Sequence, residues 1–208
     1  MDNSAAPHRS HLEIATALLD AGVRVLQLRD KSASDGALRE TTGELLPLVH
    51  SRGAQLVLND RLELASEFSG LGVHLGQDDA SPTEARLALG PEVLIGWSTH
   101  DLSQVAAAQS LPLDYIGFGP VFGAAGKHRC DADPRTPMSP RGTDLLAEAV
   151  HASALPVVAI GGINDGNLDA ILQTNVRWIA AISSVTQAED MLRAATYLDQ
   201  HCRARKRR

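Results

Sequence analysis

No part of the sequence approaches the roughly 18 consecutive apolar residues that a membrane-spanning helix needs, which excludes such a helix. Cysteine is nearly absent. Cys130 and Cys202 lie far apart and make no metal-ligand spacing, so we expect reduced thiols, as in a cytosolic protein. Residues 1–5 lack the charged and apolar regions of a signal peptide. We therefore expect a cytoplasmic protein with no membrane partner.

The chain also lacks the excess of basic charge that nucleic-acid-binding proteins carry. Its formal net charge is −6, so we expect no nucleic-acid partner. The basic run at 201–208 is a local exception, which we interpret as a solvated tail. The length of 208 residues predicts one domain over 1–208, with flexible ends at 1–9 and 200–208. The sequence leaves the oligomeric state open, and a homo-oligomer is one of the states it allows.

Short runs rich in β-branched residues alternate with longer amphipathic segments along the chain. The expected strands are 23–29, 54–59, 72–75, 93–98, 115–119, 156–161 and 177–183. The expected helices are 10–21, 35–50, 61–68, 81–89, 101–109, 143–152, 165–173 and 187–199. Several strands are continuously apolar, which is typical of parallel strands covered on both faces. The alternation predicts either a doubly wound sheet or a (β/α)8 barrel.

Polar residues at the carboxyl ends of nearly all the expected strands favour the barrel. A doubly wound sheet concentrates its chemistry at one switch point, whereas a barrel brings every strand end to one mouth. The place of the first strand, residues 1–10, has no apolar run. We therefore expect an α/β protein with a (β/α)8 TIM barrel whose first strand is missing from this chain, unless the start of the chain is miscalled or cut.

The first expected strand ends in polar and charged residues that suit a diphosphate. Arginine offers a bidentate fork and lysine a point charge. The chain has only three lysines, and Lys31 and Lys127 both fall beside strand-end loops. Ordinary surface charge at a strand end is the alternative interpretation. The residues of this segment are Gln27, Leu28, Arg29, Asp30 and Lys31.

Carboxylates follow the next two expected strands, in the pairs Asn59-Asp60 and Asp78-Asp79. Carboxylates from neighbouring strand ends can share one Mg²⁺, which proteins usually hold with one or two carboxylates and substrate phosphate oxygens. The alternative is that Asp60 and Asp79 cap the helices that follow them. Together with the nearby cations, the pattern favours a metal site.

The loops after the last two expected strands contain Gly161-Gly162 and Ser183-Ser184. Barrels commonly bind a phosphate in these loops through backbone N–H groups, and glycine lets the backbone approach it closely. A tight turn is the alternative for the glycines. His74 falls on an expected strand, where a core histidine with satisfied hydrogen bonds is the favoured interpretation.

Several segments, taken in order, resemble the thiamine phosphate synthase family. The resemblance covers about 9–198, nearly the whole chain. It implies a (β/α)8 barrel transferase that joins hydroxymethylpyrimidine diphosphate to thiazole phosphate and releases pyrophosphate, with small phosphorylated molecules as its partners. The segments that carry it are 27–31, 58–60, 72–79, 96–100, 114–122, 158–163 and 182–190.

The resemblance also implies roles for individual residues. Asp60 and Asp79 would hold Mg²⁺ as the cofactor, and no residue is assigned as a general acid or base. The pyrimidine diphosphate would contact Gln27, Leu28, Arg29, Asp30, Lys31, Asn59, Ser98 and Lys127. The thiazole phosphate would contact Gly162, Ile182 and Ser183.

The loop before Lys127 departs from the family pattern. The family usually has Thr-x-Thr-Lys there, and this chain has Ala124-Ala125-Gly126-Lys127, so two hydroxyl groups are missing. A weakened synthase and a non-catalytic barrel that binds a thiamine precursor are therefore both left open. A related isomerase, thiazole tautomerase, is a further alternative, but that family tends to carry a histidine where Pro120 stands.

Overall fold

A computed structural model describes residues 1–2, 5–123 and 139–205 of the chain. All seven expected strands are present: β1 (Val25–Leu28), β2 (Gln55–Asn59), β3 (Gly72–Leu75), β4 (Ile95–Thr99), β5 (Tyr115–Phe118), β6 (Val157–Ile160) and β7 (Trp178–Ala180). The helices are α1 (His11–Asp20), α2 (Asp35–Ser51), α3 (Leu62–Ser66), α4 (Pro82–Leu89), α5 (Leu102–Ala108), α6 (Gly142–Ala152), α7 (Leu168–Gln173), α8 (Ser183–Thr186) and α9 (Met191–Arg205).

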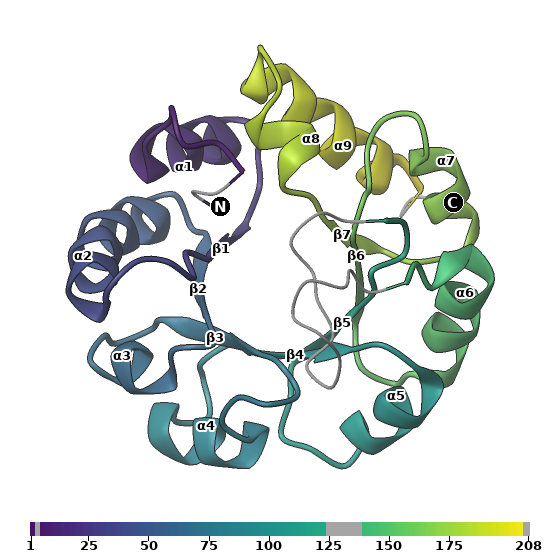
Figure 1. Cartoon of the computed structure of the whole chain (residues 1–208), viewed down its shortest axis with the longest axis horizontal. Coiled ribbons are helices and arrows are strands. Elements are labelled where there is room, and N and C mark those ends of the chain that lie inside the picture. Colours follow the sequence, from purple (N-terminus) through teal and green to yellow (C-terminus); the bar gives the residue numbers. More distant parts are fainter. Residues whose placement is uncertain (3–4, 124–138, 206–208) are drawn as a thin grey trace.

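The strands form one parallel sheet whose spatial order follows the chain, from β1 to β7. The sheet curls around a central axis and the helices surround it, as Figure 1 shows. This confirms a parallel, barrel-like α/β fold. The described residues give seven paired strands, with β1 and β7 at the two ends of the sheet, and do not close the expected eight-stranded barrel.

The place of an eighth strand is only partly filled. Asp2 forms a parallel bridge with Arg29, and the Arg29 N–H donates to the Met1 carbonyl at 2.8 Å. This contact covers only the carboxyl end of β1. Val25, near the other end of β1, is 49% exposed, and Trp178 on β7 is 41% exposed. Among the described residues, no strand therefore fills the gap between β1 and β7 over most of their length.

Serine caps explain where three of the helices begin. The side chains of Ser10, Ser34 and Ser81 each accept a hydrogen bond from the first turn of α1, α2 and α4. Ser10 and Ser81 also make capping boxes with the glutamates three residues later. These caps lie where the sequence predicts the helix starts, so local chemistry sets the boundaries.

The carboxyl-terminal part of the chain differs from the expectation in two places. The last strand ends at Ala180, because Ser183 begins the short helix α8, so the expected strand 177–183 was too long. The final helix α9 begins at Met191 and runs to Arg205, beyond the expected 187–199. Arg203 pairs with Asp199 one turn earlier, which helps to extend the helix into the basic run. The expected flexibility of 1–9 and 200–208 stays a prediction.

Pairing between strands determines which side chains face the barrel interior. Residues paired across neighbouring strands point to the same face of a sheet. Leu26 pairs with Leu56, and Leu28 pairs with Leu58, and all four are buried on the outer face, in the main core beneath the helices. The inner face contains instead polar residues and glycines, together with some apolar residues such as Val57 and Val158.

Three of these inward glycines occupy crowded positions. A Cβ atom at Gly72 would lie 2.6 Å from the Leu94 carbonyl oxygen. At Gly96 it would lie 2.1 Å from the Tyr115 ring, and at Gly117 3.1 Å from the His74 ring. The inner face therefore needs glycine at these positions so that larger side chains of neighbouring strands fit.

No helix within the described parts of the chain has the length and apolar character needed to cross a membrane.

The crowding at Gly72 predicts opposite effects for two alanine substitutions. Gly72→Ala should lower the free energy of unfolding by about 1–3 kcal/mol, because the added methyl group meets backbone. Gly43→Ala should raise it by about 0.5–1 kcal/mol, because Gly43 is an exposed residue of α2 with nothing within 4 Å of its Cβ position. Urea unfolding measures both. A Gly72→Ala protein as stable as the native one would contradict the close packing described here.

Candidate active site

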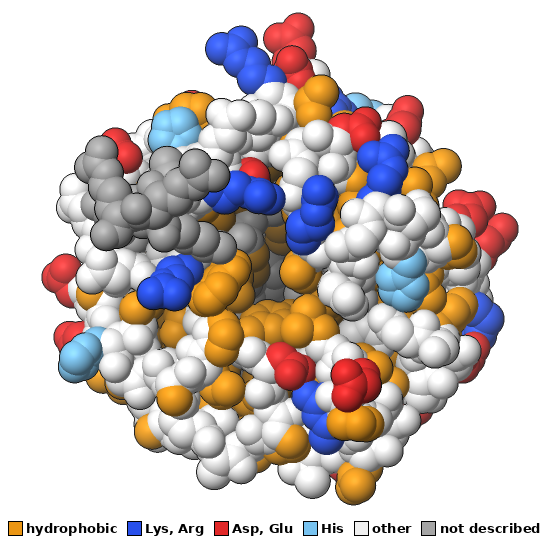
Figure 2. Space-filling model, turned by 180° about the vertical axis from the view of Figure 1, so that it is seen from behind, with side chains coloured by type: hydrophobic (Ala, Val, Ile, Leu, Met, Phe, Trp, Pro, Cys, Tyr) orange, Lys and Arg blue, Asp and Glu red, His pale blue; other side chains and the backbone are white. Residues whose placement is uncertain are grey.

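The carboxyl ends of the parallel strands meet at one mouth of the barrel. Most of the residues predicted from the sequence to bind substrates or metal lie at these ends or in the loops that follow. Figure 2 shows the opposite end of the barrel, which is hollowed near its centre, with hydrophobic side chains in the hollow and basic and acidic side chains around it. The end at which the strand carboxyl ends meet has the geometry of the ligand-binding end of a barrel.

Asp60, Asp79 and Lys31 form a charged cluster after β1, β2 and β3. The Lys31 ammonium lies 3.4 Å from the Asp60 carboxylate, and Lys31 is largely exposed. The Asp60 carboxyl group lies within hydrogen-bonding reach of that of Asp79. The pKa of Asp79 is raised, mainly because its carboxyl group loses hydration and also because Asp60 is close, although the Gly76 N–H opposes this. The predicted carboxylate pair is therefore brought together.

Neither carboxylate caps a helix, so the alternative of capping was wrong. The N-cap of α3 is Arg61, which makes no side-chain capping bond, and the N-cap of α4 is Ser81. Asp79 accepts a 2.6 Å hydrogen bond from the Gly76 N–H within its own loop. Asp60 has a φ of 66°, in the left-handed region that aspartate tolerates better than most residues.

The predicted diphosphate-binding segment after β1 is divided between ligand-facing and structural groups. Arg29 pairs with Asp2 through one guanidinium nitrogen, and a guanidinium has other donors to offer. Leu28 is fully buried, so only its backbone could reach a ligand. Asp30 accepts hydrogen bonds from Ser32 and from the Ala33 N–H at 2.7–3.1 Å. Burial alone would raise the pKa of Asp30, but these bonds more than offset it and lower that pKa.

A chain of polar side chains lies on the inner face of the barrel. The two ring nitrogens of His74 contact the Tyr115 hydroxyl at 3.0 Å and the Ser98 hydroxyl at 2.9 Å. The Gln27 side chain approaches the same Tyr115 hydroxyl. Asn59 is the inward neighbour of His74 on β2. Gln27, Asn59 and Ser98 were predicted substrate contacts, so His74 and Tyr115 connect parts of the predicted site.

The final loops bring Gly162, Ile182 and Ser183 to the ends of β6 and β7. Gly162 has a φ of 66°, and a Cβ atom there would lie 2.6 Å from the Gly123 carbonyl oxygen. Its own carbonyl accepts a 2.8 Å bond from the Asn167 side chain. The glycine is therefore required by its backbone conformation and by close packing. Ile182 precedes α8 and Ser183 is its first residue.

Sequence reasoning assigned no individual role to two residues of this region, Tyr115 and Ser184, although Ser184 lies in a loop that was predicted to bind phosphate. The role of Tyr115 depends on a contact across strands, and nothing in the local sequence signals it. Ser184 has a buried hydroxyl oxygen without a hydrogen-bond partner in the described structure. A buried polar atom without a partner is costly unless a ligand or ordered water completes it. Lys127 and the adjoining 124–126 lie outside the described residues.

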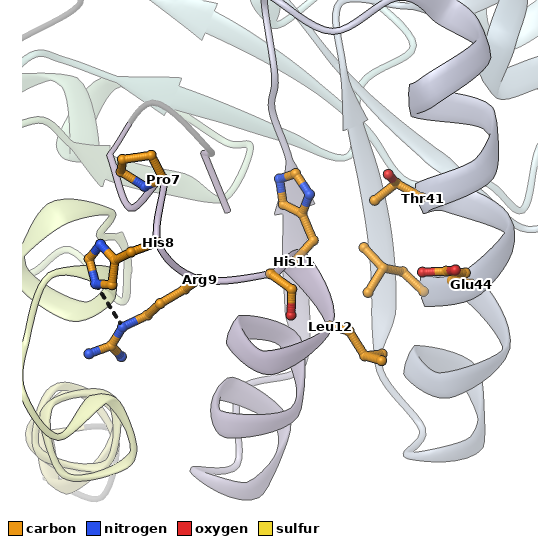
Figure 3. Close-up of a pocket in the computed structure, with 9 residues that line it drawn as sticks. Pro7, His8, Arg9, His11, Leu12, Thr41 and Glu44 are labelled. Carbon is orange, nitrogen blue, oxygen red and sulfur yellow. Dashed lines mark hydrogen bonds between the residues drawn. The ribbon is translucent and has the colours of Figure 1, made fainter.

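A pocket of about 420 Å³ lies outside the mouth, between α1 and α2. Figure 3 shows it with His8, Arg9, His11, Thr41 and Glu44 among the residues around it. Arg9 donates to His8 at 3.3 Å. None of the residues predicted to bind substrates or metal lines this pocket, so the candidate site is the barrel mouth.

Burial of Tyr115 predicts a loss of stability at alkaline pH. Burial raises the pKa of the Tyr115 phenol, Gln27 opposes this, and Asp114 adds to it. Because the folded-state pKa is above the unfolded value, the stabilising contribution is complete below about pH 10 and is lost above it, by up to about 1.4 kcal/mol per pH unit. Urea unfolding at pH 9 and 11 should show a fall that Tyr115→Phe reduces. An identical fall in both proteins would contradict this assignment.

Comparison with known proteins identifies relatives along nearly the whole chain. A family profile described as thiamine monophosphate synthase matches residues 1–185. A thiamine-phosphate synthase of Albidiferax ferrireducens is 36% identical over 199 residues, which are 96% of this chain and 88% of that protein. One of a Synechococcus species is 39% identical over 184 residues, which are 88% of this chain and 50% of that protein. The solved thiamine phosphate pyrophosphorylase from Pyrococcus furiosus has a TM-score of 0.81 and 30% identity, covering 94% of this chain and 91% of that one.

Proposed function

The chain belongs to the thiamine monophosphate synthase family, and from this premise we propose that it condenses hydroxymethylpyrimidine diphosphate with thiazole phosphate. The products are thiamine phosphate and pyrophosphate. The observation that carries the proposal is the family match over residues 1–185, together with a mouth in which Lys31, Asp60 and Asp79 form one charged cluster. Such a cluster suits a diphosphate that arrives with a divalent cation.

The residues present fit a magnesium ion. Within the described parts of the chain no group of three or more histidine, cysteine, aspartate or glutamate side chains forms a metal cage. Magnesium needs only one or two carboxylates, because water and substrate phosphate oxygens supply the rest. Asp60 and Asp79 would hold the ion; loss of hydration and, to a smaller extent, the closeness of Asp60 raise the pKa of Asp79. When bound, it would supply positive charge to the diphosphate oxygens.

Basic side chains of the protein would neutralise the remaining negative charge of the diphosphate. During the reaction the bond between the pyrimidine methylene carbon and the diphosphate oxygen breaks, and negative charge grows on the departing pyrophosphate. Arg29 and Lys31, at the end of β1, would stabilise that charge, and Lys127 would add to it. The thiazole nitrogen then bonds to the methylene carbon. This bond needs no general base, which agrees with a site in which none is assigned.

The phosphate of the thiazole substrate would occupy the loops after β6 and β7. Support comes from the left-handed conformation of Gly162 and from the buried, unpartnered hydroxyl of Ser184 next to Ser183. Backbone N–H groups of such loops are common phosphate ligands in barrels. The adjoining hydroxyl would gain a partner when the phosphate binds.

One assay distinguishes this transferase from a non-catalytic barrel. Purified protein is mixed with both substrates and Mg²⁺, and thiamine phosphate and pyrophosphate are measured together. Formation of both products in equal amounts supports the proposal. Tight binding of either substrate without product would favour the binding-only alternative, which the missing threonines at 124 and 126 left open. A cytoplasmic location stays a prediction from the sequence.

Removing either carboxylate should abolish Mg²⁺-dependent binding of the pyrimidine diphosphate. Asp60→Ala and Asp79→Ala each take away half of the proposed metal ligands, and loss of one such ligand costs at least about 10–100-fold in affinity. Isothermal titration with and without Mg²⁺ measures the effect. Unchanged diphosphate affinity in both variants would show that the pair does not hold the ion.

Ser184→Ala should change stability and phosphate affinity in opposite directions. The hydroxyl is buried and has no hydrogen-bond partner among the described residues, so its removal should leave stability unchanged or raise it by about 1 kcal/mol. Affinity for thiazole phosphate should fall by about tenfold or more, because a hydrogen bond to a charged group is lost. Ser183→Ala is the matched control, since Ser183 is expected to act through its backbone. Lower stability of Ser184→Ala with unchanged affinity would contradict the assignment.

A further inference from the structure

His74 is buried on the inner face of the barrel between two hydroxyl groups that belong to different strands. Its Nδ1 atom lies 3.0 Å from the Tyr115 hydroxyl and its Nε2 atom lies 2.9 Å from the Ser98 hydroxyl. The side chain is 9% exposed, and its ring stacks on that of Tyr115 with 5.5 Å between centroids. The imidazole therefore has a fixed orientation and cannot turn without losing both contacts.

Two glycines create the space in which this arrangement forms. Gly96 pairs laterally with both His74 and Tyr115, and a Cβ atom there would lie 2.1 Å from the Tyr115 ring. Gly117 pairs with Ser98, and a Cβ atom there would lie 3.1 Å from the His74 ring. The contact between the two rings is therefore built into the packing of three neighbouring strands.

We assign the hydrogen bonds of this side-chain network a single direction, in which the Tyr115 hydroxyl donates its hydrogen to His74 Nδ1. A neutral imidazole with an acceptor at Nδ1 carries its hydrogen on Nε2 and donates it to the Ser98 oxygen. The Ser98 hydrogen is then directed away from His74. Gln77 holds the Ser98 backbone carbonyl at 2.5 Å, which fixes the residue further.

We propose that His74 is a positioning residue that holds the Ser98 hydroxyl as a hydrogen-bond donor to an acceptor atom of the pyrimidine diphosphate. The inference rests on the proposed function, in which Ser98 contacts that substrate. His74 itself touches no substrate atom. Its effect passes through Ser98, with Tyr115 as the group that sets its tautomer.

Coupling between His74 and Ser98 tests the proposal. Ser98→Ala should weaken pyrimidine diphosphate binding by about 10–100-fold, as expected for a lost bond to a charged ligand. His74→Asn, whose shorter amide reaches toward Tyr115 but not toward Ser98, should weaken it by a similar factor. In the Ser98→Ala background, His74→Asn should add less than about threefold, because contacting residues that act as a unit are not additive. His74→Gln, which is long enough to donate to Ser98, should recover most of the affinity.

A control variant on the same strand distinguishes the effect of His74 on substrate binding from a general loss of folding stability. Thr99 follows Ser98, is fully buried on the opposite face of β4, and donates to the Gly117 carbonyl at 3.1 Å. Thr99→Val should lower the unfolding temperature and leave the Kd of the pyrimidine diphosphate unchanged. The Kd of thiazole phosphate should not change in any His74 variant that remains folded.

A spectroscopic measurement on the native protein tests the tautomer without any variant. Nitrogen-15 spectra of the histidine rings, with the His74 signals identified by through-bond correlation to its backbone, should show the hydrogen on Nε2. A hydrogen on Nδ1, or additive losses for His74→Asn and Ser98→Ala, would overturn the positioning role. Native protein that does not bind the pyrimidine diphosphate at all would instead overturn the proposed function, and the positioning role with it.

Discussion

The parallel register between neighbouring strands is the constraint on which the site depends. Because paired residues share a face, Asn59, His74, Gly96 and Tyr115 form one row across β2, β3, β4 and β5 on the inner surface. A shift of one residue on any of these strands would exchange this row for leucines and isoleucines that now pack beneath the helices. Burial of the outer face therefore fixes the position of every polar group inside the barrel.

The closeness of Asp60 and Asp79 at the barrel mouth lowers the stability of the folded protein and suits the binding of a cation. The pKa of Asp79 is raised mainly because its carboxyl group loses hydration, and the repulsion between the two neighbouring carboxylates adds to this. Lys31 relieves only part of it, because the ammonium is 64% exposed to solvent. Perturbed acids of this kind gather at functional sites, and here the proposed Mg²⁺ would supply the missing compensation.

Much of this architecture could be predicted from residues in sequence, and the rest depends on contacts between strands. Apolar runs and amphipathic segments predicted the seven strands and most helix starts, because these are local signals. The approach of Asp60 to Asp79 was predictable, since parallel strand ends converge. The contact of His74 with Tyr115 was not, because it needs Gly96 between them and a register that no local pattern reveals. The short helix α8 was not predicted for a similar reason, because tertiary packing rather than local sequence stabilises its single turn.

The strict agreement between chain order and spatial order has a consequence for how the protein is made. Each strand from β2 to β7 pairs with the one before it, and within the described residues β1 and β7 do not pair with each other. Every β/α unit can therefore dock on its predecessor as soon as it leaves the ribosome, without waiting for a distant partner. Assembly of this kind resembles growth of a repeat array from one end, in which the newest strand is always the exposed edge.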